Sequence, residues 1–146
     1  MPVVYTIGFT KKSLEQFIGA LQAAGVQWVV DVRLRNTSQL AGWSKYPDFA
    51  YLLRRGFGLD YEHQPDFAPT DELLDRYKKD KNWQGYERDF NRLLQIRNPV
   101  EAARSILSKP AACLLCTEPT ADKCHRRLVA EYLASFAGDD LAIKHL

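Results

Sequence analysis

Two nearly continuous apolar runs constrain the fold of this chain more than any other feature. They are VQWVVDVR at residues 26–33 and AACLLC at residues 111–116. A strand that is apolar at nearly every position is covered on both faces, as in a parallel sheet between two layers of helices. These runs therefore predict an α/β fold with a buried sheet.

Extended and helical segments alternate around these two runs. Ser13 and Gln16 fit a capping box that opens a helix, and Gly25 ends that helix. Asn98 and Pro99 are predicted as the cap and first position of a later helix. Further strands are predicted at residues 3–7, 58–63 and 141–146, and further helices at residues 47–55, from residue 70, around residues 86–94, and at residues 100–107 and 122–136. We expect one Rossmann-like α/β domain over residues 1–146, with about five mostly parallel strands and helices on both faces.

The composition excludes several classes of protein. With 146 residues, 46% of them apolar, the chain can form one core without disulfides. A net charge of +2 is too small for a protein that holds nucleic acid mainly by charge. We expect no leader peptide, because no basic stretch precedes the first apolar segment, and no apolar segment of the sequence is long enough to cross a bilayer. Three cysteines, an odd number, suit a reducing compartment, so we expect a cytoplasmic protein with no membrane partner.

The ends of the predicted strands indicate where a ligand binds. In parallel sheets, ligands bind beyond the carboxyl ends of neighbouring strands whose connections leave in opposite directions. If the first and fourth strands are neighbours, the loops that follow them share one crevice, and both loops lead to helix N-termini that attract anions. We expect Gly8, Thr10 and Ser13 on one side of this crevice, and a small anionic molecule as the partner.

The segment LLCTEPTADKCHRR at residues 114–127 is expected to form the other side. Cys116 ends the fourth predicted strand, where a thiol near cationic groups and a helix N-terminus becomes nucleophilic at neutral pH. The alternative for Cys116 is an inert, buried side chain. Cys113 points to the opposite face of the strand and is expected in the core.

Other residues of this segment are candidates for proton transfer or anion binding. His125 is predicted to face the crevice as a proton donor or acceptor, or else to be satisfied by a backbone carbonyl. Glu118 is the predicted general acid or base, with a solvated turn residue as the alternative. Arg126 is predicted to bind an anion, unless it forms a surface ion pair with Asp122. Cys124 is expected to pack in the core.

Asp31 and Arg33 share one face at the end of the second predicted strand. A carboxylate inside a buried strand is costly unless it is paired. We expect Asp31 to pair with Arg33, or else to reach a functional cation such as Arg126, and both residues are candidates for the anion site.

A zinc site made of Cys116, Cys124 and His125 is a weaker alternative. Neighbouring residues of a helix diverge by about 100° around its axis, which makes joint ligation by Cys124 and His125 awkward. The sequence also has no paired C-x-x-C motif. We therefore predict neither a metal ligand nor a cofactor.

The polar segment RLRNTSQLAGWSK at residues 33–45 has two interpretations. It is either a mobile loop that covers the crevice, or a patch that binds a phosphate backbone. In the second case Arg33, Arg35 and Lys45 would contact phosphates while Trp43 stacks on a base.

Three motifs together resemble one known family. They are TIGFT at residues 6–10, DVR at residues 31–33, and CTEPTADKCHRR at residues 116–127, the last with a specific C-x-E-x5-C-H-R spacing. On these motifs the chain is similar, over essentially its whole length, to the bacterial and archaeal proteins called domain of unknown function 488. The resemblance implies an α/β fold but supplies no activity. It also points to five residues as important, namely Cys116, Glu118, Cys124, His125 and Arg126.

We predict that the chain binds an anion or nucleotide in a crevice that contains a thiol, a histidine and an arginine. The expected substrate is phosphorylated or nucleotide-like, with Cys116 as nucleophile and His125 or Glu118 as proton shuttle. The sequence leaves open whether the protein is an enzyme and what its oligomeric state is. A non-catalytic module that binds nucleic acid is the alternative.

Overall fold

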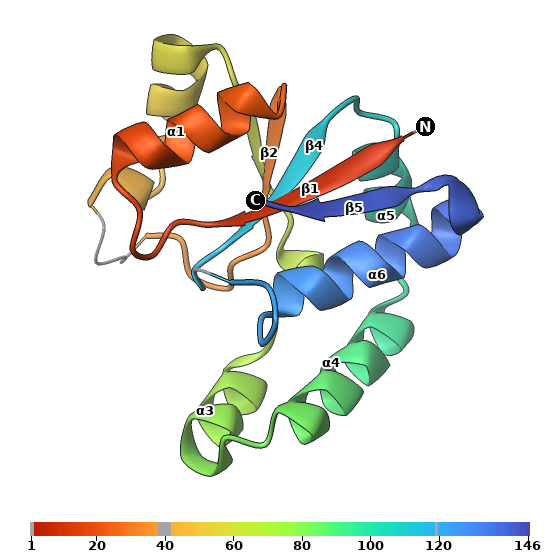
Figure 1. Cartoon of the computed structure of the whole chain (residues 1–146). Helices are drawn as coiled ribbons and strands as arrows, with labels where there is room; N and C mark the ends of the chain where they lie inside the picture. The colour runs from red at the N-terminus through yellow and green to blue at the C-terminus, as the bar shows by residue number, and fades with distance from the viewer. Residues whose placement is uncertain (1, 38–41, 119) are drawn as a thin grey trace.

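The sheet has five strands, and every neighbouring pair is parallel. A computed structural model describes residues 2–37, 42–118 and 120–146 of the chain. The strand order is β3-β2-β4-β1-β5 (Figure 1). The strands are β1 (Val3–Gly8), β2 (Trp28–Asp31), β3 (Asp60–His63), β4 (Ala112–Cys116) and β5 (Ala142–His145). The predicted α/β fold with a parallel sheet is confirmed.

Within the described residues, six α-helices connect these strands. They are α1 (Leu14–Ala23), α2 (Asp48–Tyr51), α3 (Asp71–Asp80), α4 (Trp83–Arg97), α5 (Val100–Leu107) and α6 (His125–Ala137). Short irregular helices cover Gly42–Ser44, Leu52–Gly56, Pro65–Phe67 and Gly138–Asp140. None of the helices in the described ranges is long and apolar enough to cross a membrane.

Local sequence signals explain where several helices begin and end. The predicted capping box is present, because Ser13 accepts from the backbone of Gln16 while the Gln16 side chain bonds back to Ser13. The prediction for Asn98 is wrong. Asn98 ends α4 in the left-handed conformation, with a φ of 47°, which asparagine tolerates better than most residues. Pro99 then takes the capping position of α5.

Helices cover both faces of the sheet, as predicted. On one face, α1 and α2 bury Phe17, Leu21 and Phe49 against strand residues such as Cys113. On the other face, α6 packs over the strands and is contacted in turn by α4 and α5, and this is the face of Cys116. The alternation along β4 therefore separates the two cysteines, and the prediction that Cys113 lies in the core on the opposite face is confirmed.

The first and fourth strands are neighbours in the middle of the sheet. Gly8 lies opposite Cys116 in the register of the two strands. The chain leaves β1 in the direction of β2, beyond β4, and leaves β4 in the direction of β5, beyond β1. The two connections diverge at this point, so the predicted switch in topology is confirmed.

Helices α3 and α4 form a hairpin that is set apart from the sheet, with α6 lying between α4 and the strands (Figure 1). The hairpin is held by aromatic contacts between its two helices, among them Tyr77 with Trp83 and Tyr77 with Tyr86. Its placement leaves a space beyond the carboxyl ends of β2 and β4, and this space contains the candidate site.

Candidate functional site

The loops after β1 and β4 are joined directly to each other. The backbone N and the Oγ1 of Thr10 both donate to the carbonyl oxygen of Thr117, at 3.1 and 2.6 Å. A Cβ atom on Gly8 would lie 1.5 Å from the carbonyl oxygen of Glu118. Only glycine permits this approach, so Gly8 has a structural reason to be in its position.

A cavity of about 360 Å³ lies on the other side of the loop that follows β4. Its walls come from the chain after β2, the start of α6 and the α3–α4 hairpin. The lining residues are Arg33, Leu34, Arg35, Pro69, Leu74, Tyr77, Lys78, Trp83, Tyr86, Cys116, Thr117, Glu118, Lys123, Cys124 and His125. Gly8, Thr10 and Ser13 are not among them, so an anion site at those residues would be a separate place and stays a prediction.

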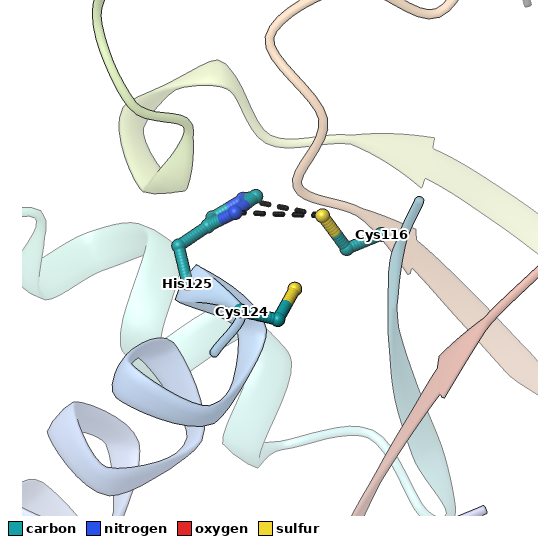
Figure 2. A group of neighbouring side chains, drawn as sticks. All are labelled: Cys116, Cys124 and His125. Atoms are coloured by element: carbon teal, nitrogen blue, oxygen red, sulfur yellow. Dashed lines mark hydrogen bonds between the residues drawn. The ribbon is translucent and has the colours of Figure 1, made fainter. Parts of the chain in front are cut away.

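Cys116 and His125 meet at the inner wall of this cavity. The Cys116 Sγ lies 3.4 Å from the Nδ1 of His125 and 3.8 Å from its Nε2 (Figure 2). Both residues are more than nine-tenths buried, with exposed fractions of 5% and 6%. The histidine ring packs edge to face on Phe90, which fixes its plane.

A backbone carbonyl determines which nitrogen of His125 is available. The Nε2 lies 2.7 Å from the carbonyl oxygen of Val32, which can only accept a hydrogen bond. The proton of the neutral ring is therefore on Nε2, and the unprotonated Nδ1 is the ring nitrogen nearer to the Cys116 sulfur. The two interpretations of His125 are thus compatible, because a carbonyl satisfies one nitrogen while the other lies close to the thiol.

Cys124 brings a second sulfur to the same place. It caps α6 with an extended backbone, at φ −139° and ψ 138°, and its side chain makes no capping hydrogen bond. The predicted helix start at residue 122 is therefore wrong, since α6 begins at His125. Cys124 is buried as expected, but its sulfur points toward Cys116 (Figure 2).

The surroundings lower the pKa of Cys116 below its usual value. The hydrogen bond from Cys124 lowers the pKa most. A hydrogen bond from the Thr117 backbone and the charge of Arg126 also lower it, whereas burial raises it. The same hydrogen bond and burial raise the pKa of Cys124. Burial also raises the pKa of Cys113, on the opposite face. Among the three thiols, Cys116 is the one whose thiolate is favoured.

Arg126 is completely buried beneath the loop that follows β4. Its Nη1 donates to the carbonyl oxygen of Glu118 at 2.5 Å, and its Nε donates to the Oγ1 of Thr6 at 3.2 Å. The Nη1 also lies 3.8 Å from the sulfur of Cys124. A fully buried guanidinium excludes a surface ion pair with Asp122, so that alternative is wrong. Arg126 is not among the cavity residues and acts on the site through the loop and through its charge.

Asp31 and Arg33 form the predicted buried pair. The Asp31 carboxylate accepts from the Nε and Nη2 of Arg33, each at 2.8 Å, and from the hydroxyl of Tyr61. The Arg33 guanidinium lies over the rings of Phe9 and Phe49, which belong to the core on the face opposite Cys116. The expected pairing of Asp31 with Arg33 is confirmed. This pair satisfies the buried carboxylate of Asp31 without a bond to Arg126.

The segment at residues 33–45 is anchored on both sides of residues 38–41, which lie outside the described residues. The Asn36 amide donates to the hydroxyl of Tyr61. Trp43 packs against the rings of Phe9, Phe17 and Phe49. The prediction of a mobile loop concerns partly those undescribed residues and is not tested.

Three donor atoms converge in a way that a metal ion can use. The Sγ atoms of Cys116 and Cys124 and a ring nitrogen of His125 all lie within 4.8 Å of one another. The sequence argument against joint ligation fails, because Cys124 precedes the helix and its side chain does not follow the helical spacing. Two thiolates and one imidazole are a donor set that zinc accepts.

The α3–α4 hairpin supplies cavity residues that the sequence did not reveal as functional. Tyr77, Trp83 and Tyr86 form an aromatic wall, and Lys78 and Lys123 are exposed at its rim. The signal was present in the stretch RYKKDKNWQGYERD at residues 76–89, which mixes basic and aromatic residues. A solvated helix end explains that composition equally well, so only the tertiary packing identifies the wall.

Comparison with known proteins agrees with the resemblance seen in the motifs. The family described as Domain of unknown function DUF488 matches the chain over residues 13–133. The chain belongs to this family. The match spans every candidate residue from Ser13 to Arg126, whereas Gly8 and Thr10 lie before its start. No curated protein and no solved structure matches the chain.

Proposed function

We propose that this DUF488 protein is a cysteine-dependent enzyme that acts on a small anionic substrate, phosphorylated or nucleotide-like. The observation that carries the proposal is the contact of 3.4 Å between the Cys116 Sγ and the unprotonated Nδ1 of His125, at the wall of a cavity. A nucleophile within reach of a base that a third group orients is the common arrangement of covalent catalysis.

The proposed proton path is short. The Nδ1 of His125 takes the proton of the Cys116 thiol, while the Val32 carbonyl holds the ring through Nε2. The Arg126 charge and the hydrogen bond from Cys124 stabilise the resulting thiolate. Glu118 is exposed at the cavity mouth, where its carboxylate can exchange protons between substrate and water.

The cavity rim and wall support the class of substrate. Lys78 and Lys123 place two cations at the mouth, which favours an anionic group such as a phosphate. Tyr77 and Trp83 offer ring surfaces on which a planar heterocycle can stack. A molecule with a ring at one end and an anion at the other therefore suits this cavity, as a nucleotide does.

Alkylation of Cys116 tests the nucleophile. We expect iodoacetamide to react with Cys116 below pH 8.5, the usual range for a cysteine, and His125→Gln to slow the reaction at pH 7 by about tenfold. Cys113→Ser is the matched control, because this buried thiol lies on the other face. A Cys116 that reacts only above pH 8.5 would remove the proposal.

Comparing two reagents tests the preference for anions. Iodoacetate carries a negative charge that iodoacetamide lacks. The rate of Cys116 with iodoacetate divided by its rate with iodoacetamide, compared with the same ratio for free cysteine, therefore reports the electrostatic potential at the thiol. We expect a ratio above that of free cysteine, and a lower ratio in Lys78→Glu or Lys123→Glu. A ratio that is equal for all these proteins would exclude a role for the cationic rim.

The structure offers less support for a module that binds nucleic acid. Trp43 packs in the aromatic cluster around Phe49, and the Arg33 guanidinium is bound to Asp31, so both side chains already have partners within the fold. A fall in affinity for labelled oligonucleotides between low and high salt would revive this alternative.

The three free thiols also fit our proposal of a cytoplasmic location, where cysteines stay reduced.

A zinc centre is the second candidate function, and the convergence of three donor atoms within 4.8 Å favours it. Cys116, Cys124 and His125 would hold the ion, leaving a fourth position toward the cavity, as in catalytic zinc sites. We expect protein purified without a tag to carry about one zinc per chain if this is correct, and Cys124→Ser to lose it. Metal-free protein that binds no added zinc would reject this candidate.

A further inference from the structure

We propose that Cys116 and Cys124 act as a pair of thiols that reduces a small anionic disulfide, with Cys124 resolving the mixed disulfide formed on Cys116. This inference rests on the proposed function, because it needs Cys116 as the nucleophile. It adds the class of electrophile, which is sulfur, and it gives Cys124 a chemical role.

The distance between the two sulfurs is the first support. They lie within 4.8 Å of each other, and Figure 2 shows the Cys124 sulfur pointing toward that of Cys116. A disulfide bond has a length of about 2.05 Å, and a change of side-chain rotamer moves a cysteine sulfur by roughly 3 Å. A change of side-chain rotamer can therefore bring the two sulfurs within bonding distance.

The backbone around Cys124 is the second support. Cys124 lies before the first turn of α6 in an extended conformation, and its sulfur makes no capping bond that a reaction would break. The Nη1 of Arg126, at 3.8 Å from this sulfur, is a fixed cation for the thiolate that attacks. His125, next in the chain, provides the nearby base.

The position of a second thiol also discriminates among electrophiles. Acyl and phosphoryl groups on a cysteine are normally released by water, and a neighbouring thiol is not needed for that step. A mixed disulfide, in contrast, is released by attack of another thiol on the sulfur. A buried thiol beside the nucleophile is thus the expected partner for sulfur chemistry, and the cationic rim with Lys78 and Lys123 favours a disulfide that carries anionic groups.

The proposed steps are balanced. The Cys116 thiolate attacks one sulfur of the small disulfide, so that a protein–substrate S–S bond forms, the substrate S–S bond breaks, and one small thiolate leaves. Cys124 loses its proton to His125 and attacks the Cys116 sulfur, forming the Cys116–Cys124 disulfide and releasing the second small thiolate. The substrate gains two electrons and the protein loses two, while the two protons from the thiols pass to solvent.

A single-turnover experiment tests the pair. Fully reduced protein, freed of reductant, is mixed with dithiobis(nitrobenzoate), an anionic aromatic disulfide whose released thiolate is coloured. We expect wild-type protein and the control Cys113→Ser to release two equivalents rapidly and to keep no adduct, with a loss of about 2 Da in intact mass and a peptide that links Cys116 to Cys124. Cys124→Ser should release one equivalent and retain the adduct, and Cys116→Ser should lose the rapid phase.

The two hypotheses fail in different ways. Wild-type protein that keeps a stable adduct on Cys116, as Cys124→Ser does, would overturn the resolving role and leave the nucleophile intact. A rapid phase that survives in Cys116→Ser would overturn the proposed function itself. The result on wild-type protein needs no variant to fold, and Cys124→Ala repeats the test without a hydroxyl in the site.

Discussion

Replacing Gly8 by alanine tests the contact on which the whole site depends. The added Cβ would lie 1.5 Å from the Glu118 carbonyl oxygen and 2.7 Å from the Nη1 of Arg126. The first of these atoms is backbone and the second belongs to a fully buried side chain, so neither can move away cheaply. The loop after β4 must therefore shift, or β1 must separate from it.

The size of the effect follows from the contacts that such a shift weakens. Overpacking of a close-packed site costs about 1–3 kcal/mol. The shift also strains the two bonds from Thr10 to the Thr117 carbonyl and the bond from Arg126 to Glu118, each worth about 1 kcal/mol. We expect Gly8→Ala to lower the free energy of unfolding by about 3–5 kcal/mol, a large part of the 5–15 kcal/mol typical of a domain.

Urea denaturation at pH 7 measures this loss, and α1 provides a matched control. With a slope of about 2 kcal/mol per molar urea, the midpoint of Gly8→Ala should fall by roughly 2 M. Gly19 is exposed in the middle of α1 with nothing within 4 Å of its added Cβ. Gly19→Ala should therefore stabilise the protein by about 0.5–1 kcal/mol. The reasoning is refuted if Gly8→Ala loses less than about 1 kcal/mol, because the two loops then do not constrain each other.

Two further predictions concern buried ionisable groups. Asp31→Ala should cost about 3–5 kcal/mol in urea denaturation, because it leaves Arg33 buried without its carboxylate. Asp71→Ala, which breaks an exposed pair with Arg35, should cost at most about 1 kcal/mol, and equal losses would contradict this account. Burial, followed by the nearby Cys116 and Cys124, raises the pKa of Tyr86, so the folded phenol keeps its proton while the unfolded phenol ionises above pH 10. Its contribution to the free energy of unfolding is complete below pH 10 and falls by about 1.4 kcal/mol per pH unit above it. Tyr86→Phe should therefore make the free energy of unfolding fall less steeply above pH 10. The control Tyr51→Phe, at an exposed position, should leave that slope unchanged.

The sequence predicted those features that one segment or one physical rule determines. The apolar runs at residues 26–33 and 111–116 indicated buried strands, and the divergent connections around β1 and β4 followed from ordinary rules of parallel sheets. The pairing of Asp31 with Arg33 followed from the cost of a buried carboxylate. The same local reasoning placed Cys116 at a strand end and His125 near a helix start, where the structure has them.

Features that arise from packing between distant segments were not accessible in this way. The cavity was expected between the loops after β1 and β4, but Gly8 allows those loops to close on each other. The α3–α4 hairpin, which has no signal of its own for docking beside Cys116, forms the outer wall instead. Cys124 was placed inside a helix because the amphipathic pattern extends back to it, although α6 begins one residue later.

The bond between His125 and the Val32 carbonyl means that the site can either react through its thiols or bind a metal ion, but not both at once. Because Nε2 donates to that carbonyl, only Nδ1 remains available, and its lone pair accepts either a proton or a metal ion. Zinc bound through Nδ1 and the two sulfurs would occupy the atoms that alkylation and disulfide formation need. Added zinc should therefore suppress the reaction of Cys116 with iodoacetamide and the release of the second equivalent from dithiobis(nitrobenzoate), and a chelator should restore both. If zinc binds without changing these rates, it occupies a site other than Cys116, Cys124 and His125, and the thiol pair in the cavity stays free of metal.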